Sequence, residues 1–140
     1  MIYSIIESSS EEVRIQKTGN KYILFVDGKQ ASIVYCDDYN QEGFNWALIS
    51  NVYTEEQYRG HGYARMLIAE AYKDIKKKYN GKVGLYCFVL PDNKSAIKLY
   101  KKCNFAEIMR YTIDGTDYII MGTKANKNNF KQFEGRTFYD

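Results

Sequence analysis

The stretch QYRGHGYARMLIAEAYKDIKKK, residues 57–78, decides the fold because it joins a glycine-containing turn to an amphipathic helix. After the turn, apolar residues recur at helical spacing and lysines occupy the last turn. Gly60 and Gly62 stand directly before this helix, where the first backbone N–H groups point outward at the positive end of the helix dipole. Because glycine leaves this backbone bare, residues 59–64 are suited to hold an anion such as a pyrophosphate.

Other interpretations of the same glycines can be tested against the sequence. A P-loop requires Gly-Lys-Ser/Thr, which is absent, and a dinucleotide-binding GxGxxG would need glycine or alanine where Arg65 stands. An RNA-recognition motif lies on a strand, whereas here a helical period follows. An ordinary turn that uses glycine for a positive φ remains as the alternative to the anion cradle.

Size and composition indicate one folded domain over residues 1–124, followed by a polar extension over 125–140. The net charge of +3 is too small to indicate nucleic acid as a partner. Three separated cysteines and a single histidine do not form a metal motif, so no metal is expected. The N-terminus resembles neither a signal peptide nor a membrane span, so we expect a cytoplasmic protein with free thiols.

Hydrophobic periodicity predicts six strands and two helices in the order β-β-β-α-β-α-β-β. Asp-Gly dipeptides, the favoured residues of tight hairpin turns, divide the first and last segments into hairpins. This order predicts an α/β (α+β) fold, in which a mixed, mostly antiparallel sheet carries flanking helices. The expected elements are two strands within 21–37, a central strand at 44–54, a helix from about 63, a buried strand at 82–90, a helix at about 93–103 and a hairpin at 106–124.

Two blocks of sequence resemble motifs of the GNAT family of N-acetyltransferases. The segment at 57–62 matches Arg/Gln-x-x-Gly-x-Gly/Ala, the family's acyl-CoA pyrophosphate loop. NKSAIKLYKKCNF (93–105) is similar to its later motif, Asn-x-x-Ala-x-x-Leu-Tyr-x-x-x-Gly-Phe. The two blocks stand in the family's order with an interior strand between them, and the resemblance covers residues 44–122. It implies a GNAT-like acyl-CoA acyltransferase fold.

The resemblance implies that acetyl-CoA is the cosubstrate and that an unidentified primary amine, on a small molecule or a protein, is the acceptor. The family motif assigns Tyr100 as the catalytic residue that donates a proton or hydrogen bond to the leaving thiolate, although an inward tyrosine on a helix also serves core packing. Asn93 would bond the cofactor or act only as a helix N-cap. The expected cofactor-binding residues are Val52, Thr54, Arg59, Gly60, His61, Gly62, Tyr63, Ala64 and Asn93.

Several features depart from the family pattern. Glu56 stands where proline is common, and Asn104 replaces a glycine in a position that asparagine tolerates. Residues 8–14 allow at most a short helix, so the N-terminal helical region that shapes the family's acceptor pocket is shortened. His61 is not expected to act as a base.

No general base is assigned from the sequence. Acidic residues beside the central strand and at the end of the preceding hairpin are equally explained as a solvated face; they are Asp37, Asp38, Glu42, Glu55 and Glu56.

Two alternatives to an acetyltransferase stay open. The short acceptor region is consistent with a CoA-binding module that lacks transferase activity. The tail KANKNNFKQFEGRTFYD (124–140) carries lysines and aromatic residues that would suit an interaction protein. A homodimer through an exposed strand edge is also open, but the sequence locates no such interface.

Overall fold

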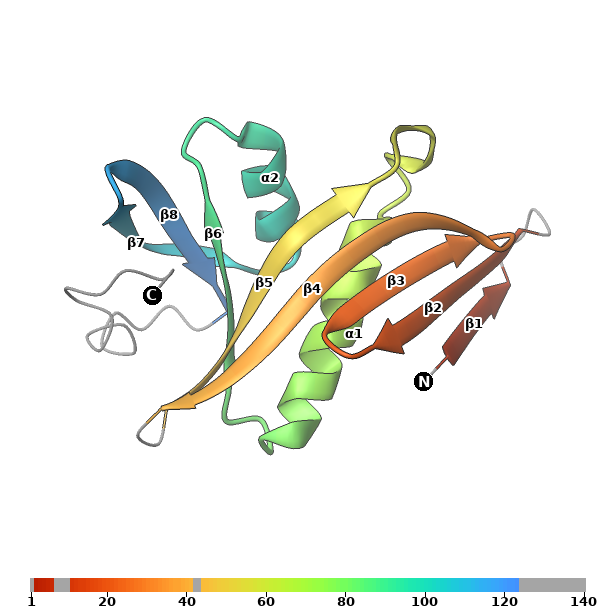
Figure 1. Cartoon of the computed structure of the whole chain (residues 1–140), viewed down its shortest axis with the longest axis horizontal. Helices are drawn as coiled ribbons and strands as arrows, with labels where there is room; N and C mark the ends of the chain where they lie inside the picture. Colours follow the sequence, from red (N-terminus) through yellow and green to blue (C-terminus); the bar gives the residue numbers. More distant parts are fainter. Residues whose placement is uncertain (1, 7–10, 42–43, 124–140) are drawn as a thin grey trace.

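The computed structural model describes residues 2–6, 11–41 and 44–123, which form one twisted sheet with two α-helices (Figure 1). The eight described strands lie in the order β1-β2-β3-β4-β5-β6-β8-β7, and every neighbouring pair is antiparallel except β5–β6. This confirms the mixed, mostly antiparallel fold. The elements are β1 Ile2–Ile6, β2 Glu12–Thr18, β3 Lys21–Val26, β4 Lys29–Gln41, β5 Phe44–Thr54, the 3-10 turn η1 Glu56–Tyr58, α1 Tyr63–Lys78, β6 Gly84–Val89, α2 Lys94–Lys102, β7 Ala106–Ile113 and β8 Thr116–Gly122.

The two Asp-Gly hairpins are confirmed. Asp27 and Gly28 have φ of 48° and 80°, and Asp114 and Gly115 have φ of 49° and 80°. Positive φ at both central residues is the signature of the type I′ turn, whose twist matches that of the flanking strands. These turns fix the register of β3 against β4 and of β7 against β8.

The N-terminal region, for which the sequence allowed at most a short helix, contains a strand. The described residues 12–18 form β2, which pairs with both β1 and β3. The sequence does carry a signal for this arrangement: Val13 and Ile15 alternate with polar residues, and Gly19-Asn20 follows in a turn with Gly19 at φ 61°. Two strands therefore extend the sheet in the region where the family has helices.

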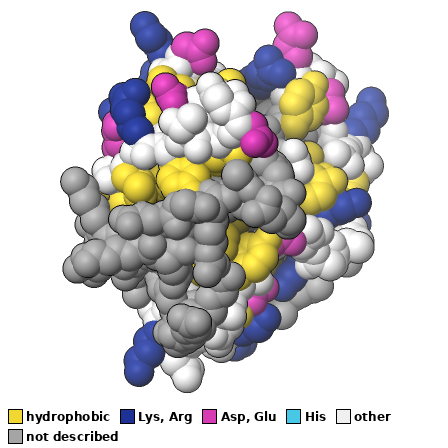
Figure 2. Space-filling model, turned by 60° about the vertical axis from the view of Figure 1, so that its left-hand side comes forward, with side chains coloured by type: hydrophobic (Ala, Val, Ile, Leu, Met, Phe, Trp, Pro, Cys, Tyr) yellow, Lys and Arg dark blue, Asp and Glu magenta, His cyan; other side chains and the backbone are white. Residues whose placement is uncertain are grey.

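The core lies mainly between one face of the sheet and the two helices. Leu67, Ile68 and Ala71 of α1 are buried against the strands, and Tyr100 of α2 joins the same cluster. On the opposite face, Trp46 and Tyr86 lead a smaller cluster that, within the described residues, contains no helix residue. Figure 2 brings the left-hand side of Figure 1 forward and shows several hydrophobic side chains of the described residues on this side of the molecule.

The strands β5 and β6 part along their length. Their parallel pairing covers only Trp46–Leu48 against Gly84–Tyr86, although β5 continues to Thr54 and β6 to Val89. The pairing of β4 with β5 shifts register near Asn51, whose φ is 50°. A bulge of this kind bends its strand and increases its local twist. No described helix has the length and apolar character needed to cross a membrane.

Candidate active site

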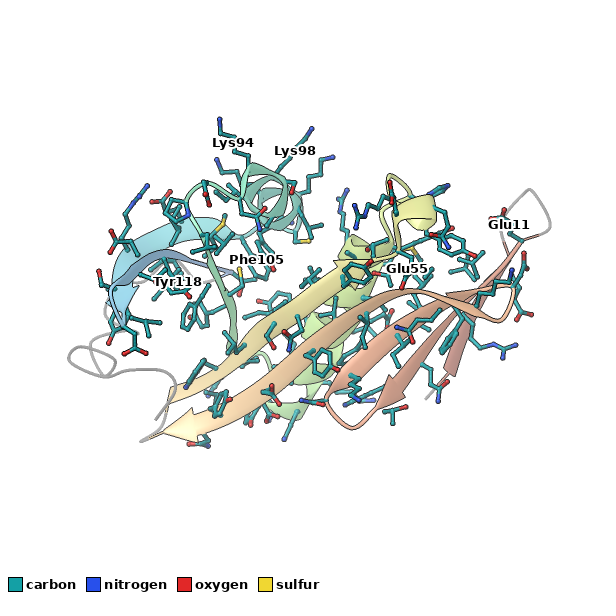
Figure 3. The ribbon with its side chains drawn as sticks, turned by 45° about the horizontal axis from the view of Figure 1, so that its top comes forward. Glu11, Glu55, Lys94, Lys98, Phe105 and Tyr118 are labelled. Carbon is teal, nitrogen blue, oxygen red and sulfur yellow. The ribbon has the colours of Figure 1, made fainter. Side chains whose placement is uncertain are left out.

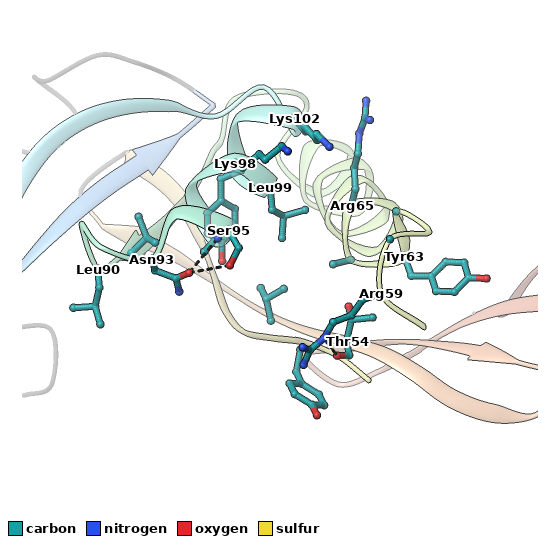
Figure 4. A pocket seen from close by; sticks show the side chains of 18 of the residues that line it. Thr54, Arg59, Tyr63, Arg65, Leu90, Asn93, Ser95, Lys98, Leu99 and Lys102 are labelled. Carbon is teal, nitrogen blue, oxygen red and sulfur yellow. Dashed lines mark hydrogen bonds between the residues drawn. The ribbon is translucent and has the colours of Figure 1, made fainter. Parts of the chain in front are cut away.

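A cleft of about 830 Å³ lies where β5 and β6 part (Figure 4). Its walls come from the end of β5, the glycine turn, the start of α1, the end of β6, α2 and β8. All the predicted site residues except His61 line it, so the fold brings both sequence motifs together. The described lining residues are Val52, Tyr53, Thr54, Tyr58, Arg59, Gly60, Gly62, Tyr63, Ala64, Arg65, Phe88, Val89, Leu90, Asn93, Ser95, Ala96, Lys98, Leu99, Tyr100, Lys102 and Tyr118.

The glycine turn presents bare backbone to this cleft. Gly60 and Gly62 have φ of 84° and 76°, a left-handed conformation that favours glycine. A Cβ atom on either residue would meet no other atom within 4 Å, so open space stands beside both. Gly62 is the N-cap of α1 and supplies no capping side chain. The N–H of Met66 donates the first hydrogen bond within the helix, to the Gly62 carbonyl at 3.0 Å. The helix N-terminus is therefore open to a ligand from the cleft.

Arg59 links the glycine turn to the end of β5 through a hydrogen bond. Its Nε donates a hydrogen bond to the Thr54 carbonyl at 3.0 Å, and its guanidinium lies 5.8 Å from the centre of the Tyr53 ring. The side chain is exposed and still lines the cleft. The Thr54 hydroxyl is held at 2.8 Å from that of the buried Ser32, which fixes the end of β5.

His61 is the one predicted cofactor residue that does not line the cleft. Its ring is exposed, stacks on Tyr63 at 5.2 Å between ring centres, and places Nδ1 3.0 Å from the Tyr58 carbonyl. Its contribution to an anion site is thus restricted to its backbone. The Tyr63 side chain, by contrast, is buried in the core, so Tyr63 also offers the cleft its backbone.

Tyr100 is positioned by the end of α2. Asn104 has φ 65°, and the N–H groups of Phe105 and Asn104 donate to the carbonyls of Tyr100 and Lys101, each at 3.0 Å. This is the Schellman motif, and it confirms that asparagine serves where the family has glycine. The Tyr100 and Phe105 rings stack with centres 5.6 Å apart.

The Tyr100 side chain lies at the inner wall of the cleft, with 6 % of its surface exposed. Burial is the largest cause that raises the pKa of its hydroxyl, and the neighbouring Cys87 and Cys103 thiols raise it further. The hydroxyl is consequently protonated at neutral pH and is a hydrogen-bond donor. Tyr100 thus packs in the core and also lines the cleft, and its catalytic role stays a prediction.

Asn93 caps α2. Its Oδ1 accepts hydrogen bonds from the Ala96 N–H and the Ser95 hydroxyl, both at 3.2 Å. The same side chain lines the cleft, and its Nδ2 makes no hydrogen bond with the described residues. Capping therefore uses the carbonyl end of the amide and leaves the donor end for another partner.

The cleft is basic. Four of its lining residues are cationic and, of the described residues that line it, none is acidic. Of these cations, only Arg59 is predicted from the sequence; Arg65 on α1 and Lys98 and Lys102 on α2 are not. The spacing of Lys98 and Lys102, four residues apart on one helix face, was the available signal.

The acidic candidates for a general base lie away from the cleft. Asp38 accepts hydrogen bonds from Lys78, at 2.7 Å, and from Tyr79, and the bond from Lys78 is the largest cause that lowers its pKa. Asp37 accepts a hydrogen bond from Asn20 at 2.8 Å.

Two of the remaining acidic candidates, Glu55 and Glu56, are not among the lining residues of the cleft, and Glu42 falls outside the described residues. Within the described part of the chain, no three His, Cys, Asp or Glu side chains gather as metal ligands would.

Comparison with known proteins identifies this architecture. A family model described as "Acetyltransferase (GNAT) family" matches residues 5–105. No curated protein matches the sequence significantly.

Solved structures share the fold at low identity. Naa50 of Arabidopsis thaliana, in complex with the bisubstrate analogue CoA-Ac-MVNAL, has a TM-score of 0.61 at 23 % identity, covering 74 % of this chain and 72 % of its own. The ribosomal-protein-S18-alanine N-acetyltransferase of Escherichia coli has 0.58 at 24 %, covering 80 % and 76 %. A putative phosphinothricin N-acetyltransferase has 0.59 at 27 %, covering 78 % and 74 %.

Proposed function

The chain belongs to the GNAT acetyltransferase family, and we propose that it transfers the acetyl group of acetyl-CoA to a primary amine by direct attack in a ternary complex. The observation that carries the proposal is the cleft between β5 and β6, with a glycine turn at a helix N-terminus and four cationic side chains. A ligand with a pyrophosphate and a narrow pantetheine arm needs this combination of bare amides, positive charge and an elongated opening.

Acetyl-CoA supplies a thioester: a carbon–nitrogen bond forms at its carbonyl carbon, the carbon–sulfur bond breaks, and the amine nitrogen loses a proton. Backbone amides at Gly60–Ala64 hold the pyrophosphate. Backbone groups of Val52 and Thr54 bind the pantetheine arm, and the Nδ2 of Asn93 binds it from the other wall. An N–H of β5 polarises the thioester carbonyl, a contribution of about 3 kcal/mol for one such donor.

Tyr100 would stabilise the leaving sulfur. Because burial raises the pKa of its hydroxyl, the group keeps its proton at neutral pH and can donate it, or a hydrogen bond, to the thiolate. Its place in the lining of the cleft, which residues at the end of β5 also line, supports this role.

One observation favours a second function, a CoA-binding module without transferase activity. The described cleft lining offers neither a carboxylate nor an imidazole that could take the proton from an acceptor ammonium. In the first function, a water chain or the bulk solvent accepts that proton.

Two measurements on the full chain separate these functions. Isothermal calorimetry with acetyl-CoA tests the site, and we expect micromolar or tighter binding. Release of free thiol, followed with a panel of primary amines that includes small molecules and peptide N-termini, tests transfer. Binding with acceptor-dependent thiol release supports the transferase, binding without release for any amine supports the module, and the absence of binding overturns both.

A further inference from the structure

Side chains from both faces of the sheet line the cleft. Val89 and Tyr100 belong to the core between the sheet and the helices, whereas Phe88 packs against the smaller cluster on the opposite face. Because successive side chains of a strand alternate between its faces, Tyr118 on β8 shares the face of Ile120, which belongs to that smaller cluster. The cleft therefore reaches from the helix-covered face of the sheet to the other face.

Large apolar side chains line the cleft on this second face. Tyr53 follows Val52, which packs on the helix side, and Leu90 follows Val89, which does the same, so both point the other way. Tyr53 is 49 % exposed and Leu90 is 42 % exposed. Such side chains mark a place where an apolar partner can bind. We call four lining residues the apolar mouth; they are Tyr53, Phe88, Leu90 and Tyr118.

The apolar mouth is separated from the cations of α1 and α2. Figure 4 shows Leu90 on the opposite side of the cleft from Arg65 and Lys102. Figure 3 shows Lys98 projecting outward from α2, and Tyr118 lying apart from it on β8. The two sides of the cleft thus differ in character: one carries positive charge beside the helices, and the other carries aromatic rings and a leucine.

This difference assigns the two sides to the two substrates. The proposed acetyl-CoA site occupies the helix-covered side, because the glycine turn and the N-terminus of α1 stand there. An acceptor amine then reaches the thioester from the side that the cofactor leaves open, which is the apolar mouth. The inference below rests on the proposed function, since it assumes that acetyl-CoA occupies the cleft.

The apolar mouth favours an aromatic ring on the acceptor. Aromatic rings bury a large apolar area and pair favourably with other rings, and three of its four members are aromatic. Its contacts are few, because the cluster behind it contains no helix residue among the described residues. Four side chains without an overlying helix provide contacts for one ring rather than for several residues of a peptide.

The charges of the cleft act against a second positive charge on the acceptor. The Arg59 guanidinium lies 5.8 Å from the centre of the Tyr53 ring, so a cation reaches this side of the cleft too. Of the described residues that line the cleft, none is acidic. A polyamine would therefore bring its additional ammonium groups toward like charge without a carboxylate to pair with them.

We propose that the acceptor is a small arylalkylamine, a primary amine joined by a short alkyl chain to one aromatic ring and without a second positive charge. The ring lies in the apolar mouth and directs the nitrogen toward the thioester. The carbon–nitrogen bond forms as the carbon–sulfur bond breaks, the CoA sulfur leaves as the thiol, and the remaining proton of the ammonium goes to solvent.

Acceptor-dependent thiol release by the full chain with acetyl-CoA tests the proposal. The acceptors are 2-phenylethylamine, propylamine, spermidine and a tripeptide that begins with phenylalanine. Removing the ring from water should give 2-phenylethylamine a kcat/KM at least about tenfold above that of propylamine. Repulsion by the cationic cleft should place spermidine below 2-phenylethylamine, and the tripeptide should also be the poorer acceptor.

Two variants test the residues of the apolar mouth. Leu90→Ala and Tyr118→Ala should each reduce the preference for 2-phenylethylamine over propylamine about fourfold or more, because each loses apolar contact with the ring. Tyr39→Ala is the matched control, because Tyr39 is a 40 % exposed tyrosine that stacks on Trp46 and does not line the cleft. The control should keep the preference. Calorimetry with acetyl-CoA should show unchanged affinity in all three variants, and thermal melting checks that each is folded.

Four outcomes overturn the inference. Turnover of propylamine or spermidine that equals that of 2-phenylethylamine excludes the aromatic acceptor and leaves the transferase intact. Faster turnover of the tripeptide excludes a small amine. An unchanged preference in both Leu90→Ala and Tyr118→Ala, or an equal loss in Tyr39→Ala, excludes the apolar mouth as the ring site. If acetyl-CoA binds and no amine releases thiol, the proposed transfer fails and the inference fails with it.

Discussion

Replacing Gly62 by alanine separates the conformational role of the glycine turn from its role as a ligand site. Gly62 has φ 76° and caps α1 beside open space in the cleft. Gly81 has φ 80°, also stands beside open space, and follows the other end of α1, away from the cleft. The pair Gly62→Ala and Gly81→Ala thus imposes the same backbone strain at two places.

The expected magnitudes follow from this geometry. A Cβ in the left-handed region costs about 1–2 kcal/mol, so both variants should lose that much stability. For a chain of this length, the loss corresponds to a fall in melting temperature of about 3–7 °C. Only at Gly62 does the added methyl group occupy space in front of the helix amides. Losing one charge-assisted hydrogen bond to a phosphate should weaken binding at least about tenfold.

Differential scanning calorimetry measures the first effect, and isothermal calorimetry with acetyl-CoA measures the second. We expect similar melting temperatures for the two variants and weakened acetyl-CoA binding in Gly62→Ala alone. Acetyl-CoA affinity that is unchanged in Gly62→Ala would refute the anion cradle and leave the ordinary turn as the role of the glycines. An equal loss of affinity in Gly81→Ala would show that strain, and not occupation of the site, weakens binding.

Further expectations concern Tyr100, Asn104 and Cys36. Tyr100→Phe should retain acetyl-CoA affinity and lose acceptor-dependent thiol release; full activity in this variant would exclude the proposed role. Asn104→Gly should match or exceed the stability of the unmodified chain, whereas Asn104→Ala should lose about 1 kcal/mol because its φ is 65°. Denaturant titration measures the free energy of unfolding of both variants, and equal values would contradict the Schellman geometry. Burial raises the pKa of Cys36 from 9.0 to about 12. The unfolded chain therefore loses this proton first, and the free energy of unfolding should fall between about pH 9 and 12. This slope should be shallower in Cys36→Ala, and an unchanged slope would contradict the assignment.

The sequence predicted the parts of the fold that local physics determines. Asp-Gly turns impose positive φ values, and the period of α1 fixes which face packs on the sheet. The N-terminal strands were missed because the Gly19-Asn20 turn was not weighed and because the family leads one to expect helices there. The pairing of β2 with β3 determines that residues 12–18 form a strand. A strand of this kind does not need apolar residues at helical spacing.

The candidate site was predictable where the motif fixes the position of backbone groups in the fold. The glycine turn, Asn93 and Tyr100 meet in one cleft because the crossover through α1 brings β6 beside β5. Arg65, Lys98 and Lys102 were not predicted as cleft residues, since lysines on a helix are usually solvated and only the juxtaposition of α1 and α2 brings these three to one cleft. His61 was included by its place in the motif, although its side chain turns away from the cleft to stack on Tyr63.

The bulge at Asn51 explains how β5 serves both the core and the cleft. Ala47 and Ile49 face the helices, so strict alternation would turn Asn51 and Tyr53 toward them as well. The register shift inserts one residue, and Val52 packs against the helix-side core while Tyr53 is 49 % exposed. Asparagine tolerates the φ of 50° that this insertion requires. The change of face thus keeps a bulky ring out of the helix side of the opening and presents a smaller valine where the pantetheine arm is proposed to bind.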